Sequence, residues 1–128
     1  MARLVSERKP GVIVLMFQPQ FADLVKAGTK CQTIRPVRKN GPIRIGQPLS
    51  LRAWTGKPYR SKQVELRQVI CRFTCHLRID LDGITWPREP VMSVKELART
   101  DGFVTFAAMQ LWFEKIHGLP FTGVLIQW

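Results

Sequence analysis

The sequence contains few cysteines, and their number argues against a disulfide-bonded scaffold. Its three cysteines, Cys31, Cys71 and Cys75, cannot all pair with one another. Small secreted domains that depend on disulfides carry an even set of cysteines at framework spacings. We therefore expect a protein of a reducing compartment.

Long apolar segments are also lacking. The apolar segment Val12–Phe17 is far shorter than the roughly 20 residues that a membrane-spanning helix needs. Basic residues precede it, as in a secretory signal peptide, but Gln18-Pro19-Gln20 follows without a small-residue cleavage site. The segment is predicted to be a buried strand. The protein is expected to be soluble and cytoplasmic, with no membrane partner.

Acidic residues are scarce: 9 Asp and Glu stand against 20 Lys and Arg, which gives a formal charge of +11. Residues 1–80 carry 16 of these cations against 4 acids, whereas residues 81–128 carry 4 against 5. A positive field of this strength attracts phosphate-bearing partners. The imbalance therefore favours a nucleic acid or nucleotide partner over a surface that is basic only for solubility.

The length of 128 residues and the hydrophobic share of 45% suit one domain with one sizeable core. Residues 1–10 are predicted to be a flexible N-terminal tail because they are polar and precede Pro10-Gly11. Residues 11–128 are then a single domain.

Hydrophobic periodicity and capping residues predict an α+β fold. Helices are expected at residues 19–27, from 94 to 99 or 100, and at 106–117. Strands are expected at residues 12–17, 31–35, 43–46, 49–53, 69–80 and 121–128, with a tight turn at the glycine between the third and fourth of these. Several short strands with three short helices suggest a small β-barrel, closed or nearly closed, with the helices packed on its outside.

A zinc site is the first candidate for chemistry, and its pattern is poor. Cys71-x3-Cys75-His76 lacks the usual spacing of zinc ligands. Alternation along a strand puts both thiols on the apolar face and His76 on the other. We expect both cysteines to be buried in the core without metal, and we expect no cofactor.

The two histidines, His76 and His117, do not suggest a two-histidine ribonuclease. His117 is expected at the C-terminal end of a helix, where a partly positive imidazole suits the helix dipole. His76 shares a polar strand face with Arg72 and Arg78, so it is either a phosphate contact or an ordinary surface residue.

A stronger cluster follows Gly28. If residues 31–35 are extended, Thr33 and Arg35 face the same way and Ile34 anchors the strand in the core. Lys30 then stands at the corner that the glycine leaves. An ammonium, a hydroxyl and a guanidinium together suit an anionic or carbonyl-bearing ligand. The alternative is an ordinary solvated connection between a helix and a strand.

These residues resemble a known family. Three stretches that occur in the same order are similar to motifs of the ASCH domain family: Gly28-x-Lys30-x-x-Thr33-x-Arg35, Ile45-Gly46-x-x-Leu49-x-Leu51, and Asp101-Gly102-Phe103 followed by Trp112 and the apolar residues 121–128. The resemblance covers nearly the whole chain from Val12. It implies a barrel related to the PUA fold, a cleft beside the first motif, and roles connected with RNA.

Thr33 stands where the commonest form of the first motif has Glu. The Thr form is similar to that of small bacterial N4-acetylcytidine amidohydrolases. That resemblance implies that Lys30, Thr33 and an acid after the second helix are catalytic, and Asp101 occupies the acid's place with a side chain one methylene shorter than Glu.

Two classes of function follow. In the first, the cleft hydrolyses an amide on a modified nucleoside, with Thr33 as nucleophile, Lys30 as base or oxyanion donor, and Asp101 either orienting Lys30 or shuttling the proton. In the second, the protein is a non-catalytic RNA-binding module with Trp54 and Tyr59 as stacking surfaces. Its expected phosphate contacts are basic: Arg35, Arg38, Lys39, Arg44, Arg52, Lys57, Arg60 and Lys62. A ribonuclease on the same fold is a further alternative.

Overall fold

The computed structural model describes residues 3–5 and 11–128, which form three helices and eight strands. The helices are α1 (Pro19–Ala27), α2 (Val94–Thr100) and α3 (Phe106–His117). The strands are β1 (Arg3–Val5), β2 (Ile13–Met16), β3 (Gln32–Pro36), β4 (Pro48–Trp54), β5 (Gln63–Ile70), β6 (Phe73–Asp80), β7 (Gly83–Thr85) and β8 (Phe121–Gln127). The expected α+β class with three short helices is confirmed.

The strands form two four-stranded sheets, in the orders β1-β5-β4-β2 and β3-β8-β6-β7. All neighbours are antiparallel except β2 and β4, which are parallel. Within residues 3–5 and 11–128 no strand pairing joins the two sheets into a closed barrel. The expected barrel is therefore not found as a closed hydrogen-bonded structure.

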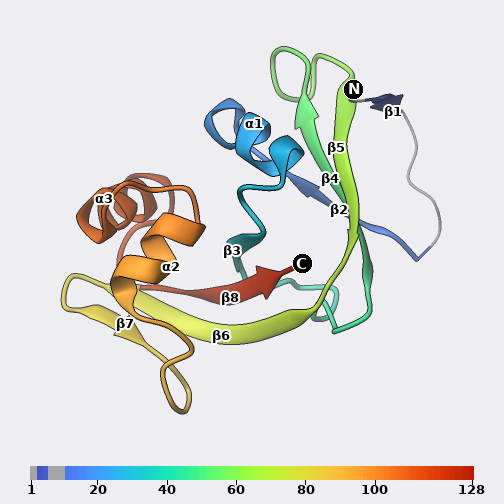
Figure 1. Cartoon of the computed structure of the whole chain (residues 1–128). Coiled ribbons are helices and arrows are strands. Elements are labelled where there is room, and N and C mark those ends of the chain that lie inside the picture. The colour runs from blue at the N-terminus through green and yellow to red at the C-terminus, as the bar shows by residue number, and fades with distance from the viewer. Residues whose placement is uncertain (1–2, 6–10) are drawn as a thin grey trace.

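The two sheets are connected by one continuous bent ribbon, β5 followed by β6 (Figure 1). At the bend, Cys71 N donates to Gln47 O at 2.9 Å, whereas Arg72 N donates to Gln127 O at 2.8 Å. The backbones of these two adjacent residues thus bond toward different sheets, since Gln47 directly precedes β4 and Gln127 ends β8. Strands that switch sheets at such bends make the corners of orthogonal packings. The predicted single strand over residues 69–80 is in fact two strands that meet at this corner.

The three helices begin and end where their capping residues predict. Gly28 ends α1 in the left-handed region, with φ of 81°. Ser93 caps α2 by accepting a hydrogen bond from Glu96 N, and Thr105 caps α3 by accepting one from Ala108 N. Local capping chemistry therefore determined these boundaries.

Two sequence expectations about strands were wrong. Residues 43–46 are not a strand, but the tight turn expected at the glycine is present: Gln47 N donates to Arg44 O, and Gly46 has a φ of 90°. Arg3–Val5 was expected in a flexible tail, yet it pairs with β5 as the edge strand β1. The rest of that predicted tail, residues 1–2 and 6–10, lies outside the described residues.

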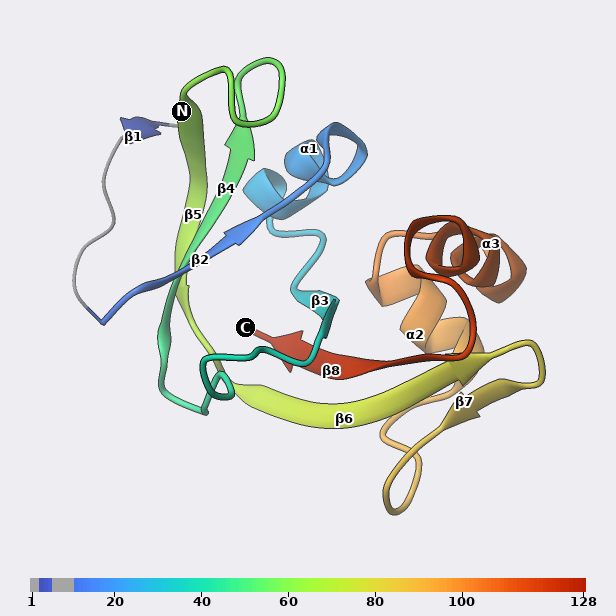
Figure 2. The same cartoon turned by 180° about the vertical axis from the view of Figure 1, so that it is seen from behind.

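The core consists of two clusters of buried side chains. The first lies between α1 and the sheet of β2, β4 and β5; the second lies between α2, α3 and the sheet of β6 and β8. Figure 2 shows α1 over the one sheet and α2 with α3 over the other. Phe103 and Trp112 pack against both clusters. The seam between them, beside β3, is where polar side chains enter the interior. None of the described helices is long and apolar enough to cross a membrane.

We predict that Met109→Ala lowers the free energy of unfolding by about 2–5 kcal/mol, because Met109 is fully buried and truncation leaves a cavity. Leu111→Ala on the same helix is the control, since Leu111 is 67% exposed, and its cost should be below about 0.5 kcal/mol. Urea denaturation measures both. Equal costs would contradict the described packing of α3.

Candidate functional site

A pocket of about 210 Å³ opens at the seam between the two core clusters. Its walls come from the end of β2, the start of α1, β3, the residue after α2, and the last turns of α3. The residues that line it are Met16, Phe17, Gln18, Phe21, Lys30, Thr33, Ile34, Arg35, Pro36, Asp101, Trp112, Phe113, Ile116 and His117. The pocket thus contains all three residues predicted to be catalytic, and Arg35 as well.

Lys30 reaches this pocket because of the way α1 ends. The left-handed Gly28 reverses the chain, so that Thr29 N and Lys30 N both donate to Leu24 O, at 2.9 and 3.0 Å. This fixes Lys30 at the corner before β3. Its side chain is only 3% exposed, and its Nζ lies 4.9 Å from the centroid of the Phe21 ring. The expected placement of Lys30 beside the glycine turn is confirmed.

Lys30 pairs with Asp101, which is 71 positions away in the sequence. Lys30 Nζ lies 3.0 Å from Asp101 Oδ1 and donates to the Asp101 carbonyl oxygen at 2.6 Å. Asp101 is the C-cap of α2 and is 4% exposed. One bond goes to the side-chain carboxylate of Asp101 and the other to its backbone carbonyl, so the ammonium is held in a single orientation.

Gln32 joins the same cluster, and the sequence reasoning missed it. Its Nε2 lies 3.4 Å from Leu97 O and 3.5 Å from Asp101 Oδ1, both long contacts, and its Oε1 accepts from Gln127 Nε2 at 3.1 Å. Gln32 stands two positions before Ile34, so it shares the core face of the strand. A glutamine at a core-facing position was the signal, because a buried amide needs partners.

Arg35 holds the opposite side of the pocket. Its Nε donates to Thr33 Oγ1 at 3.0 Å, and its Nη2 donates to Met16 O at 2.6 Å. The guanidinium also lies 4.7 Å from the centroid of the Phe17 ring. Thr33 is buried, and the predicted shared face of Thr33 and Arg35 is confirmed. The Thr33 hydroxyl oxygen thus accepts a hydrogen bond from the Arg35 guanidinium.

Burial dominates the electrostatics of the cluster. Desolvation lowers the pKa of Lys30, although the attraction of Asp101 raises it in part, and nearby Arg35 lowers it slightly. Desolvation raises the pKa of Asp101, against the opposing effect of Lys30. Burial also lowers the pKa of Arg35 to about 10. Because the pKa values of Lys30 and Asp101 shift toward each other, a proton passes between them at lower cost than between solvated groups.

Aromatic side chains form the apolar walls. Phe21 and Trp112 meet edge to face at 5.8 Å, and Trp112 lies 6.1 Å from the His117 ring. His117 was expected to be a partly positive, purely structural residue. It lines the pocket instead, and burial together with the nearby Arg35 lowers its pKa, which favours the neutral imidazole.

Apart from Arg35, the predicted ligand contacts do not line this pocket. Arg38 is half-buried and Lys39 is exposed, both just after β3, and His76 is exposed on β6. Trp54 is the last residue of β4, and its ring centroid lies 5.2 Å from that of Tyr59 in the following loop. The predicted set of site residues is therefore divided between the pocket and separate surfaces.

Arg52 was expected to contact an RNA backbone, but it is 5% exposed. Its Nε donates to Ser50 Oγ at 2.8 Å and its Nη1 to Gln63 Oε1 at 2.7 Å, while Ser50 Oγ donates to Glu65 at 2.7 Å. The Arg52 side chain is thus hydrogen-bonded to residues of the first sheet. It is not available to phosphates.

The thiols differ from each other. Cys71 is buried as expected, whereas Cys75 is only half-buried. Burial raises the pKa of both thiols, which keeps them protonated. Across the described part of the chain no group of three or more His, Cys, Asp or Glu side chains is arranged to hold a metal ion.

We predict that Asp101→Asn lowers the free energy of unfolding by about 3–5 kcal/mol at neutral pH, because it leaves the Lys30 ammonium buried without its counter-ion. A buried lysine whose pKa is lowered in the native state makes the protein more stable as pH rises toward the pKa of the unfolded state. In that range the native state binds fewer protons than the unfolded state. The loss should therefore shrink toward pH 10.

Urea denaturation at a series of pH values measures this loss. The double variant Lys30→Met/Asp101→Asn is the control, because it removes both charges and should recover much of the stability. A small, pH-independent loss in the single variant would contradict the buried ion pair.

No family model, curated protein or solved structure matches the chain. The resemblance to the ASCH family accordingly remains an expectation drawn from the motif residues.

Proposed function

We propose that the pocket binds the base of a nucleotide or modified nucleoside, and that Lys30, Thr33 and Asp101 hydrolyse an amide on that base, as in N4-acetylcytidine. One observation carries this proposal. The Lys30–Asp101 pair is buried in the wall of an aromatic pocket that Thr33 also lines. Buried pairs with shifted pKa values in a concave site are typical of catalytic acids and bases.

The size and walls of the pocket suit one ring system. Its 210 Å³ lie below the roughly 300–1,000 Å³ of pockets for larger ligands. Phe17, Phe21 and Trp112 supply apolar surface, and Lys30 and Arg35 supply donors for a carbonyl oxygen. A planar base with a short acyl group has this combination of an apolar body and a polar edge.

The chemistry that we propose uses Thr33 as nucleophile. Lys30 first passes one proton to Asp101. The neutral amine then accepts the Thr33 hydroxyl proton while Oγ1 bonds to the acyl carbon, and Lys30 returns that proton to the amine nitrogen as the carbon–nitrogen bond breaks. Water subsequently cleaves the acyl ester, releasing the acid and restoring Thr33. The lowered pKa of Lys30 supports the first step because only the neutral amine is a base.

Arg35 and Asp101 support the same steps. Arg35 Nε donates to Thr33 Oγ1, which stabilises negative charge on that oxygen and leaves the hydroxyl proton free for transfer. Asp101 orients the amine through two hydrogen bonds. Lys30 must turn toward Thr33 when substrate binds, a tightening that is common between free enzymes and their complexes.

A non-catalytic nucleotide-binding pocket is the second candidate. It is favoured by the partners of the two reactive groups, since Lys30 bonds to Asp101 and Thr33 bonds to Arg35. These partners would make a fixed donor surface for recognition. The ribonuclease alternative has less support, because His117 lines the pocket whereas His76 is exposed on β6.

The fold also bears on the family resemblance. We propose that the two sheets, linked by the bent β5–β6 ribbon, are an open version of the PUA-like barrel that the resemblance implies. In support, the pocket lies beside the first motif, where that resemblance expects a cleft. The enzymatic proposal does not depend on this point, because a fold hosts many functions.

We predict that the protein converts N4-acetylcytidine to cytidine and acetate, and that Lys30→Met and Thr33→Val each lower kcat/KM by about 10²–10⁴-fold. Liquid chromatography of the products measures turnover. Matched controls are Lys95→Met and Thr122→Val, which change exposed residues and should leave turnover unchanged.

Binding separates the two candidates. In the hydrolase, Thr33→Val keeps nucleoside affinity while turnover is lost, because it removes the hydroxyl at nearly constant shape. In the recognition pocket, wild type shows binding without turnover, Thr33→Val is mild, and Lys30→Met weakens affinity. Turnover that survives Thr33→Val would exclude Thr33 as nucleophile.

A further inference from the structure

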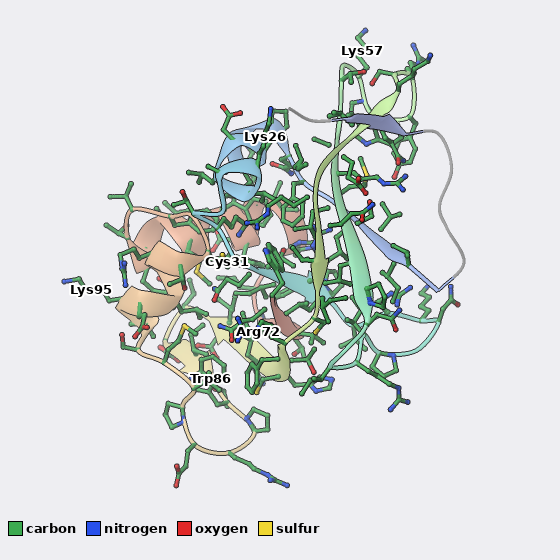
Figure 3. The ribbon with its side chains drawn as sticks, turned by 45° about the vertical axis from the view of Figure 1, so that its right-hand side comes forward. Lys26, Cys31, Lys57, Arg72, Trp86 and Lys95 are labelled. Atoms are coloured by element: carbon green, nitrogen blue, oxygen red, sulfur yellow. The ribbon has the colours of Figure 1, made fainter. Side chains whose placement is uncertain are left out.

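The loop between β4 and β5, residues 55–62, is strongly basic. It carries Lys57, Arg60 and Lys62 and no acidic residue. In Figure 3 the labelled Lys57 extends from the end of the sheet that lies farthest from α2 and its labelled Lys95. The pocket is lined by other elements. This β4–β5 loop is therefore a second surface, apart from the proposed catalytic site.

Hydrogen bonds hold the β4–β5 loop in one conformation. Thr55 N and Thr55 Oγ1 both donate to Lys62 O, at 2.9 and 2.8 Å, which closes the base of the loop. Inside it, Gly56 N donates to Ser61 Oγ and Ser61 Oγ donates to Lys57 O, at 2.9 and 2.8 Å. A loop ordered in this way keeps its cations in a defined arrangement, which lowers the entropy lost on binding.

Tyr59 at the tip of the loop is the only tyrosine in the chain. It is 90% exposed, and its φ of 64° lies in the left-handed region that costs free energy in residues other than glycine. Its ring lies 5.2 Å from that of Trp54 at 50°. Trp54 supports one side of the tyrosine ring, and the rest of that ring is open to solvent.

We propose that the β4–β5 loop binds single-stranded nucleic acid, with a base stacked on Tyr59 and with Lys57, Arg60 and Lys62 at the phosphates. Aromatic faces flanked by cations are what a single strand requires, because its unpaired bases can stack while its backbone is neutralised. Cations alone would suit any polyanion; the exposed ring adds a surface on which a base can stack. The inference goes beyond the proposed hydrolysis, since it assigns a polymer partner to a different surface.

The stacking part is tested with Tyr59→Asn and Tyr59→Phe. Asparagine tolerates the left-handed conformation, so the first variant keeps the backbone and removes the ring. Fluorescence anisotropy with a labelled 12-nucleotide uridine RNA should show a roughly five- to hundredfold loss of affinity for Tyr59→Asn and little loss for Tyr59→Phe. Melting temperatures check that both variants fold.

Fluorine NMR gives a direct readout of the same residue. Protein made with 3-fluorotyrosine has one ¹⁹F signal, because Tyr59 is the only tyrosine. That signal should shift on addition of the uridine RNA and stay unchanged on addition of polyglutamate, a polyanion without bases. An unchanged signal at RNA concentrations that saturate the anisotropy would overturn the proposal.

The electrostatic part is tested by removing the three loop cations together. Lys57→Ala/Arg60→Ala/Lys62→Ala should reduce the slope of log affinity against log salt by about two, since each single-strand phosphate contact contributes roughly 0.7. The control is a triple variant of equal net charge, which removes three exposed cations outside the loop: Arg88→Ala, Lys95→Ala and Lys115→Ala. An equal effect of both triples would show that only net charge matters and would overturn the loop site.

Failure of this inference and failure of the proposed hydrolysis are distinguishable. Tyr59→Asn should leave hydrolysis of free N4-acetylcytidine unchanged, and Lys30→Met should leave RNA affinity within about twofold of wild type. Absence of RNA binding by the wild-type protein at low salt would overturn the loop proposal alone.

Discussion

The buried pair of Lys30 and Asp101 is the interaction on which the architecture of the site depends. It joins the corner after α1 to the end of α2, and so connects the two halves of the core. Such a pair is costly to desolvate unless other groups satisfy it, and here the Asp101 carbonyl and the Gln32 amide do so. The same desolvation shifts both pKa values toward each other. The buried pair, whose desolvation lowers the stability of the fold, is thereby suited to proton transfer.

The positive charge of the protein is divided among different tasks. Lys30 and Arg35 are enclosed in the pocket, where burial lowers the pKa of each. Arg52 is enclosed in the first sheet by Ser50 and Gln63. The cations of the β4–β5 loop remain exposed on an ordered support. Net charge alone indicates an anionic partner, whereas burial decides which cations are available to meet it.

Much of the fold was predictable because its signals are local. Proline and glycine set the ends of α1, and Ser93 and Thr105 cap the other two helices through bonds to residues three positions away. The failures lay at a turn and at a bend. Residues 43–46 alternate like a strand, yet the left-handed Gly46 makes a turn, and the bend at Cys71–Arg72 divides one alternating segment between two sheets.

The sequence by itself determined the helices and the α+β class, since each depends on local pattern and spacing; the candidates Lys30, Thr33 and Asp101 came from a motif and from the family resemblance that it carries. Only the tertiary structure decided that Asp101 meets Lys30 across 71 positions, that Gln32 completes the cluster, and that His117 lines the pocket. The physical reason is that burial is a property of the packed chain. Whether a polar side chain is solvated, paired or strained depends on neighbours that are distant in sequence.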